Sequence, residues 1–295
     1  MSNAPVVHHG SHNLTFNQKR LYQIVRRSGP LSRADLTRKS GLTFPSVSRL
    51  VADLLAAGMV KEGVSRRGGM GKPPIELSVV PDHSYALGVY LNGDAATGSL
   101  INALGESVKD INFPAACLSE GVRNALMDSE LSLDRLIGVC LSTSAELVSD
   151  DKRERLSADL GVSVFAESAI ACSVRAERYF GSGSQLDRIL YFDALTLELG
   201  VLINGTVLTH PGTVKILLGV KRLKPSPKSD VLAGALKGVA ALVQAEALVA
   251  GGLSAEDFVR FKGTVTDLLV VPGSPMASNP ALAAASVPIY ETFGA

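Results

Sequence analysis

The sequence predicts an α/β protein built from two unlike parts, a small helical head and a larger body with two lobes. Three observations lead to this prediction. Apolar residues recur at helical spacing up to Gly58, between breaks made by Gly and Pro. After Pro81, apolar strands alternate with helices rich in small residues. Basic residues gather in the amino-terminal part of the chain.

The composition is that of a folded protein with more than one folding unit. The chain has 295 residues, of which 46% are hydrophobic and 19% are charged. This length exceeds that of a usual single domain, and this balance is typical of globular rather than disordered chains. The apolar stretch 231–251 is interrupted by Lys237, Gln244 and Glu246, so no membrane span is expected.

The chain end and the cysteines indicate a cytoplasmic location. Residues 1–14 lack the basic and apolar segments of a secretory signal and are expected to form a disordered tail. Cys117, Cys140 and Cys172 are scattered and include no Cys-x-x-Cys pair. This pattern favours neither a disulfide framework nor a cysteine-rich zinc site, and it fits a reducing compartment.

Charge divides the chain at the boundary between head and body. Residues 1–82 hold twelve Lys and Arg against five Asp and Glu, a balance of +7. The remaining residues hold 17 basic and 23 acidic side chains, a balance of −6, although the whole chain carries only +1. A basic head on an acidic body predicts that the head binds a polyanion.

Two helices open the head. The first is predicted over 17–27, because Gly29 and Pro30 then end the helical pattern. The second begins after Ser32, which is expected to cap it together with Asp35 in a near-capping-box arrangement, and it ends at Gly41.

A third helix is predicted over 43–57. Thr43 is the expected N-cap, Pro45 lies in the first turn, and Gly58 ends the helix. One face is apolar, which leaves polar and aromatic side chains exposed near the amino-terminal half. In a recognition helix this half enters the major groove of DNA.

A basic hairpin follows the third helix. Short strands over 59–62 and 75–77 flank the Gly-rich loop 65–74, where glycines allow close approach to phosphates and basic side chains supply the counter-charge. The order helix, short helix, Gly turn, helix, hairpin predicts a winged helix-turn-helix over 15–80 that binds a double-stranded DNA operator. The alternative is a solvated three-helix domain with a flexible basic linker. The candidate DNA-binding residues are Ser32, Arg33, Thr43, Phe44, Ser46, Ser48, Arg49, Arg66, Arg67 and Lys72.

The body, over 84–295, is expected to contain two sets of strands with helices between and after them. The hairpin turns are expected at Asn92-Gly93, Leu104-Gly105 and Asn204-Gly205. The expected strands are 85–91, 97–103, 107–113, 136–141, 162–167, 188–192, 200–203, 206–208, 247–250 and 268–271. Helices are expected to end near Phe180 and to cover 231–243 and 279–285.

Taken together, these segments resemble the ROK family, which comprises repressors with a winged-helix head and sugar kinases with a two-lobed, actin-like ATPase fold. The resemblance extends over nearly the whole chain and is specific in the order and spacing of its motifs. It implies a shortened actin-like body. The matching segments are 66–77, 86–94, 136–141, 160–167, 179–183, 200–205 and 247–253.

The departures from the kinases of that family concern phosphate binding and catalysis. The resemblance implies an Asp-x-Gly-x-Thr phosphate loop, whereas this chain has Tyr90 at the Asp position and Asn92 at a Gly, with Asp94 near the Thr. An anionic Asp94 and a bulky Tyr90 would oppose ATP. A second Gly-rich phosphate loop is replaced by 194–199.

The catalytic base and the zinc ligands are also replaced. The kinases read Glu-Asn-Asp where this chain reads Glu167-Ser168-Ala169, and alanine cannot take a proton from a sugar hydroxyl. The stretch 215–221, with Val220 at the position of the family's His, offers none of the imidazole or thiolate ligands that zinc needs. The body is also expected to lack several helices between Pro225 and Ala247.

The resemblance therefore implies a transcriptional regulator, with repression the expected mode, whose kinase-like body is not an enzyme and has neither cofactor nor metal. The body is expected to form a homodimer or higher homo-oligomer and to sense a sugar-like effector. The candidate effector-binding residues are Asn92, Asp94, Glu167 and Ser168, although Glu167 has an equal claim to a structural role in capping a helix. Two alternatives are an active sugar kinase and a scaffold-type DNA-binding protein without effector.

Overall fold

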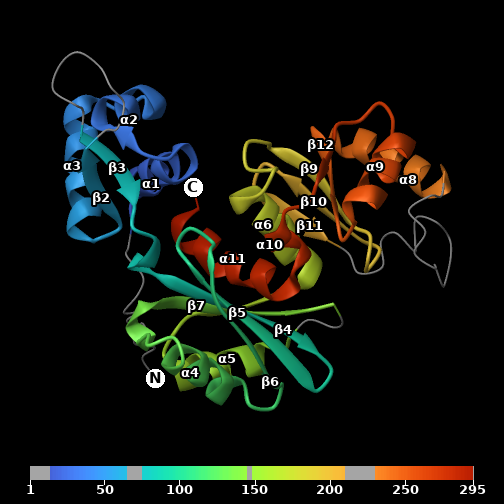
Figure 1. The fold of residues 1–295 in the computed structure, drawn as a ribbon, viewed down its shortest axis with the longest axis horizontal. Helices are drawn as coiled ribbons and strands as arrows, with labels where there is room; N and C mark the ends of the chain where they lie inside the picture. Colours follow the sequence, from blue (N-terminus) through green and yellow to red (C-terminus); the bar gives the residue numbers. More distant parts are fainter. Residues whose placement is uncertain (1–13, 65–74, 145–147, 210–229, 295) are drawn as a thin grey trace.

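The head consists of three helices and a three-stranded sheet (Figure 1). The computed structural model describes residues 14–64, 75–144, 148–209 and 230–294. The head elements are α1 (Phe16–Ser28), β1 (Leu31–Ser32), α2 (Arg33–Ser40), α3 (Phe44–Ala56), β2 (Val60–Val64) and β3 (Ile75–Val79). The predicted helices and hairpin strands all occur, with ends shifted by one or two residues, whereas the short strand β1 was not predicted.

Local capping explains where the head helices begin. Thr15 and Gln18 form a capping box at the start of α1, and Ser32 and Asp35 form one at the start of α2. Thr43 is the N-cap of α3 as predicted, but its side chain makes no capping hydrogen bond to the helix backbone. The Thr43 hydroxyl instead lies 2.9 Å from the hydroxyl of Ser46.

The first lobe of the body is a five-stranded sheet in the order β6-β5-β4-β7-β8. A short 3-10 turn, η1 (Pro81–His83), leads into it from the head. β4, β5 and β6 pair antiparallel, as the predicted hairpins require, and β7 and β8 run parallel to β4. The strands are β4 (Tyr85–Asn92), β5 (Ala95–Asn102), β6 (Ser107–Pro114), β7 (Leu136–Thr143) and β8 (Val164–Ser168).

The second lobe repeats this arrangement. Its sheet has the order β11-β10-β9-β12-β13, in which the first three strands again pair antiparallel and the last two run parallel to β9. At the predicted Asn204-Gly205 turn both residues have positive φ, as a tight two-residue hairpin requires. The strands are β9 (Arg188–Asp193), β10 (Glu198–Ile203), β11 (Thr206–Thr209), β12 (Ala247–Gly251) and β13 (Val270–Pro272).

Helices cover these sheets and connect the lobes. α6 (Ala169–Phe180) and α8 (Asp230–Val243) were predicted, whereas α4 (Leu118–Met127), α5 (Asp150–Leu160), α9 (Ala255–Thr264), α10 (Pro275–Ser278) and the 3-10 turn η2 (Leu133–Arg135) were not. No helix among the described residues combines the length and apolar character needed to cross a membrane.

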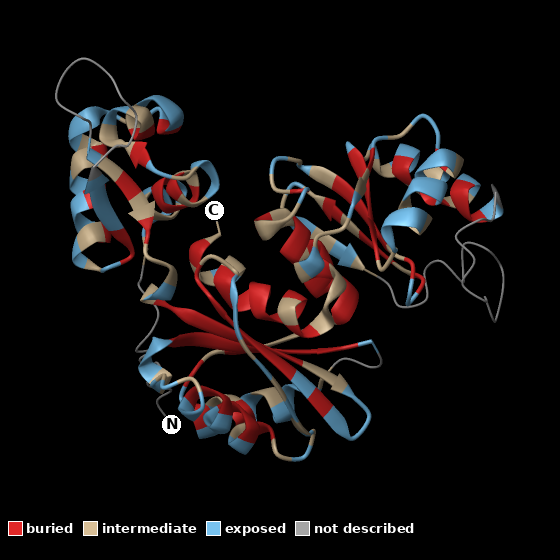
Figure 2. Cartoon of the chain, viewed as in Figure 1, coloured by how far each residue is buried: buried red, intermediate tan, exposed pale blue. Residues whose placement is uncertain are grey.

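The last helix, α11 (Pro280–Phe293), returns to the first lobe and packs on β4, β7 and α6. It was expected to end at Ala285, but it continues through Pro288, which is buried within it. Figure 2 shows buried residues concentrated in the central strands of both sheets and along α11.

The head is packed on the body through a shared apolar core. Tyr22 and Val25 of α1 belong to the same buried cluster as Ile137 of β7 and Ile289 and Phe293 of α11. The Phe293 ring lies 5.1 Å from the ring of Tyr22, between ring centroids. The first helix of the head therefore rests on the last helix of the body.

Candidate DNA interface and body sites

α3 has one buried face and one exposed face. Val47, Leu50, Val51 and Leu54 are buried against α1 and α2. On the other side, the Phe44 side chain is 53% exposed and Arg49 is also exposed. An aromatic ring that is exposed to water at the start of a helix, beside a cation, is available to contact a partner.

The short polar residues of α3 lie at the edge of this exposed face. Thr43 is exposed, and Ser46 and Ser48 are half-buried. Because Thr43 and Ser46 share a hydrogen bond, their hydroxyls are already oriented toward each other at the amino-terminal end of the helix. This end carries the positive pole of the helix dipole, which favours an anionic partner.

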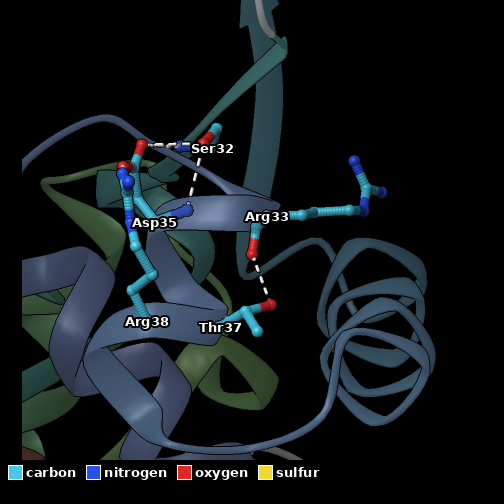
Figure 3. Close-up of polar contacts among 5 residues, drawn as sticks. All are labelled: Ser32, Arg33, Asp35, Thr37 and Arg38. Carbon is cyan, nitrogen blue, oxygen red and sulfur yellow. Dashed lines mark hydrogen bonds and ion pairs between the residues drawn. The ribbon is translucent and has the colours of Figure 1, made fainter.

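Ser32 and Arg33 are held by other parts of the head (Figure 3). The Ser32 hydroxyl donates to Asp35 Oδ2 at 2.7 Å and accepts from the Asp35 backbone N–H at 3.2 Å. These hydrogen bonds, with the Arg38 guanidinium beside it, hold the pKa of Asp35 below its ordinary value. Arg33 extends away from this cap and forms an ion pair of 2.7 Å with Glu62 of β2.

The hairpin of β2 and β3 lies beside α3 and pairs in antiparallel register from Val60↔Val79 to Val64↔Ile75. Arg66, Arg67 and Lys72, the basic side chains assigned to its loop, lie outside the described residues. Residues 215–221, which take the place of the family's zinc-binding segment, and the tail up to residue 13 also lie outside the described residues.

The candidate effector residues gather at the carboxyl end of the first sheet without forming one cluster. The register places Leu91, Thr143 and Ser168 in one row across β4, β7 and β8. Neighbouring strands are about 4.8 Å apart, so the ends of β4 and β8 are about 10 Å apart. Asn92 and Asp94 are exposed at the β4–β5 turn.

Glu167 and Ser168 have structural partners. Glu167 Oε1 lies 3.0 Å from the Arg175 guanidinium, which also lies 3.4 Å from Glu291 of α11. The Ser168 hydroxyl accepts from the Ala171 backbone N–H and so caps α6. Ala169, which the sequence resemblance aligned with the kinases' catalytic Asp, is buried.

The backbone amides of the β9–β10 turn, which the sequence resemblance aligned with the second phosphate loop, are already hydrogen-bonded. Asp193 Oδ1 accepts from the backbone N–H groups of Leu195 at 2.8 Å and Thr196 at 3.0 Å. The Ala194 N–H donates to the Gly251 carbonyl. A phosphate in this turn would have to compete with a carboxylate for these donors.

Sequence reasoning missed the residues that join head and body. The Arg26 guanidinium of α1 lies 3.8 Å from the centroid of the Tyr179 ring and donates to the Tyr179 carbonyl. Gln23 donates to the Tyr179 hydroxyl and to the Phe293 carbonyl. The partners are 153 to 270 positions apart along the chain, so no local spacing could have indicated these contacts.

Sequence comparison finds repressors. No protein-family model matches the chain. The xylose repressor of Bacillus subtilis (strain 168) is 25% identical over 213 residues, which cover 64% of this chain and 56% of the repressor. NagC of Escherichia coli (strain K12), a DNA-binding transcriptional dual regulator, is 23% identical over 216 residues, which cover 65% of this chain and 53% of NagC. This chain thus spans about half the length of the curated relatives it matches.

Structural comparison finds proteins described as members of the ROK family. A ROK family transcriptional regulator, a homologue of the E. coli Mlc protein, superposes with a TM-score of 0.66 at 16% identity, covering 94% of this chain and 96% of the other. A ROK hexokinase from Thermus thermophilus matches with a TM-score of 0.51 at 15% identity, covering 68% and 97%. The fold over nearly the whole chain is therefore the one seen in a ROK family transcriptional regulator, in agreement with the resemblance found in the sequence.

Proposed function

We propose that the chain is a DNA-binding transcriptional regulator that acts as a repressor, and that residues 15–80 form a winged helix-turn-helix. The observation that carries this proposal is the exposed amino-terminal half of α3. Its opposite face is buried in the head, so Phe44 and Arg49 are presented on a rigid support beside the β2–β3 hairpin. A recognition helix and wing need this arrangement. The repressor names of the sequence relatives point in the same direction.

The candidate residues divide into base-reading and phosphate-binding groups. Phe44, Ser46, Ser48 and Arg49 lie on α3, where side chains reach base edges or the phosphates beside them. Arg66, Arg67 and Lys72 are assigned to phosphates beside the wing. Ser32 already caps α2, so we expect it to contact DNA only where the amino-terminal end of that helix meets the duplex. To bind a phosphate, Arg33 must either give up its ion pair with Glu62 or contact the phosphate while this ion pair is kept.

The body, over 84–295, is proposed to lack phosphotransfer activity. In the β9–β10 turn Asp193 already occupies amides that a phosphate would need, and Ala169 cannot act as a base. A coupled assay over hexoses and amino sugars is expected to give no turnover above background, and turnover would reverse the assignment. The body instead holds two or more heads together. In a dimer these heads contact half-sites about one helical turn of DNA apart, or a multiple of that spacing.

If the body binds an effector, the protein is a sensor; if it binds none, the body is only a scaffold that holds the heads together. Asn92 and Asp94 are exposed in the β4–β5 turn at the edge of the first sheet. By contrast, Ser168 is engaged in capping α6, and Glu167 is engaged in an ion pair. We therefore place more weight on the β4–β5 turn than on the end of β8. A thermal-shift screen of sugars, followed by operator release with any hit, tests the sensor. A sugar that neither shifts the melting temperature nor releases DNA favours the scaffold.

DNA binding is tested with an operator selected from a random double-stranded pool, by fluorescence anisotropy at several salt concentrations. Arg49→Ala is expected to weaken binding to the selected operator more than binding to random DNA. Arg66→Ala or Arg67→Ala is expected to weaken both, and to reduce the slope of log affinity against log salt by about 1. Arg155→Ala is the matched control, because Arg155 is a 77% exposed arginine of the body.

The outcomes of this test bear on different parts of the assignment. Unchanged affinity and salt slope in both wing variants would show that the hairpin loop is not a wing. Failure to select any operator, with no salt-dependent binding to random DNA, would contradict DNA binding itself.

A further inference from the structure

A cavity of about 300 Å³ lies where the head meets both lobes of the body. Arg27 lines it from the end of α1 in the head. Arg178 lines it from the end of α6, Asn204 from the β10–β11 turn, and Tyr290 and Gly294 from α11. These segments are far apart in the sequence and converge between α1, α11 and the second lobe (Figure 1).

Among the described residues that line this cavity, two arginines face one carboxylate. Arg27 is exposed and has no carboxylate within ion-pair distance among the residues that the structure describes. Arg178 lies 3.6 Å from Asp187, but the Asp187 side chain is 71% exposed, so water screens this pair. Partial burial of its guanidinium lowers the pKa of Arg27 below its ordinary value, and the positive charges of Arg178 and Arg26 lower it further. Because Arg178 and Arg26 are close enough to repel Arg27, a bound anion would offset this repulsion.

Arg27 also lines a second cavity, of about 370 Å³. It is lined by Arg20, Arg27 and Lys39 of the head and by Gln185 of the body, and no carboxylate lines it. Arg27 is thus shared by two cavities, and the described residues that line them include four cationic side chains and one carboxylate, that of Asp187. Guanidinium groups bind phosphate through paired hydrogen bonds, and several cations together suit a dianion better than a single charge.

We propose that this junction cavity binds a phosphorylated small molecule, with its phosphate between Arg27 of the head and Arg178 of the body. The Asn204 amide and the Tyr290 hydroxyl are the polar groups available to the rest of the ligand. The volume is at the lower end of the range of small-molecule sites. Duplex DNA is the less suitable source of the phosphate, because the cavity faces the second lobe whereas α3 lies on the far side of the head (Figure 1).

Binding at this place would act on the head directly. Arg27 belongs to α1 and Arg178 to α6, so a dianion between them replaces repulsion across the head–body junction with attraction to a shared partner. Occupancy then favours one position of the head relative to the body and changes its affinity for DNA. This second step rests on the proposed DNA-binding function, whereas the binding site itself does not.

The first experiment measures binding to the full chain without DNA, by calorimetry at constant ionic strength in a buffer free of phosphate. The probes are inorganic phosphate, a panel of pentose and hexose monophosphates, and the corresponding unphosphorylated sugars, with sulfate and chloride as controls. Saturable binding of at least one phosphate ester is expected. Arg27→Gln and Arg178→Gln should each weaken it by about tenfold or more. Arg155→Gln, at an exposed body arginine, should leave it unchanged.

Three results would overturn the proposal. One is the absence of saturable binding by phosphate and by every ester, and another is binding that Arg27→Gln leaves intact. The third is equal binding of sulfate and the esters, which would show ionic screening only.

The second experiment repeats the titration of selected DNA with and without the tightest ester. A change in DNA affinity that Arg27→Gln and Arg178→Gln abolish supports the coupling. If the ester leaves the DNA affinity of the unaltered chain unchanged, the proposed coupling is wrong. If the chain binds the ester but no DNA, only the proposed regulatory function fails.

Discussion

At the scale of single residues, Ser32 illustrates how a local pattern fixes a functional surface. Its hydroxyl and the carboxylate of Asp35 form a reciprocal cap at the start of α2. Because α2 packs on α3, this cap also orients the helix that presents Arg49. A three-residue spacing in the sequence was sufficient to predict it.

Ser32→Ala is expected to lower the free energy of unfolding by about 1 kcal/mol, because the N–H of Asp35 loses its side-chain acceptor and the Asp35 carboxylate loses one of its donors. Thr43→Ala is the matched control, since Thr43 occupies the same position in α3 without a side-chain bond to the backbone. Its cost should be a few tenths of a kcal/mol. Urea unfolding at pH 7 measures both, and equal costs would contradict the capping role.

The contribution of Asp35 has a definite pH dependence. Its pKa is lowered in the folded state, so its stabilisation is complete above its ordinary value of 3.8 and is lost as pH falls through the lower folded value. The cost of Ser32→Ala should therefore be constant near neutrality and shrink only in acid.

Other important residues carry no local signal. Glu177 is fully buried at the end of α6, and its carboxylate accepts from the backbone N–H groups of Ser182 and of Ser274, which is nearly a hundred positions later. Burial raises its pKa. In the sequence Glu177 looks like a surface residue of an amphipathic helix, because the loops that enclose it are brought there only by the fold.

At the scale of secondary structure, elements with clear caps and apolar periods were predicted and weakly patterned ones were not. α5 was missed because its only buried residues are Leu156 and Leu160, in a segment that is otherwise charged. α4 carries Leu118, Val122 and Leu126 at four-residue spacing, a signal that could have been used. α11 was expected to stop before Pro288, but tertiary packing retains the helix there.

The contact of α11 with β4 makes a further prediction. A Cβ atom at Gly88 would lie 2.0 Å from the Ala281 carbonyl oxygen and 2.2 Å from the Ala285 nitrogen, both in the backbone of α11. Gly88→Ala must therefore separate the helix from the sheet, and we expect a loss of about 3 kcal/mol of unfolding free energy or more.

Gly234→Ala on α8 is the matched control. Nothing lies within 4 Å of a Cβ placed there, and the position is exposed on a helix. This change should stabilise the chain by about 0.5 to 1 kcal/mol, because Ala has the higher helix propensity. Thermal unfolding of the two variants in parallel measures the expected loss and the expected gain of stability. An unchanged stability of Gly88→Ala would show that α11 does not pack as closely on Gly88 as described.

At the scale of the whole molecule, the two sheets share one strand order, and the head is bound to the first lobe through α11. The division into head and body was predicted from the charge distribution and from the Gly and Pro residues that end the helices. The attachment did not, because Gln23 and Phe293 are 270 positions apart. Long-range contacts of this kind depend on the complete topology.

Phe293→Ala is expected to loosen the head from the body. The ring is fully buried against Tyr22 and His83, and truncation of such a side chain costs about 3 to 5 kcal/mol. Limited proteolysis should then cut faster between residues 80 and 84, where the head joins the first sheet. Leu242→Ala, at an 83% exposed position, should leave the digestion unchanged. A digestion pattern for Phe293→Ala that matches the unaltered chain would show that the head is held by other contacts.

The return of α11 to the first lobe has a consequence for the order of synthesis. The sheet of that lobe is complete once residue 168 has been made, yet the helix that covers β4 and β7 begins only at Pro280, after all the strands of the second lobe. Until then an apolar face of the sheet, including Ala86 and Ile137, is without its cover. The first lobe is therefore completed only after the strands of the second, and the nascent chain must keep this face from aggregating while the second lobe is being translated.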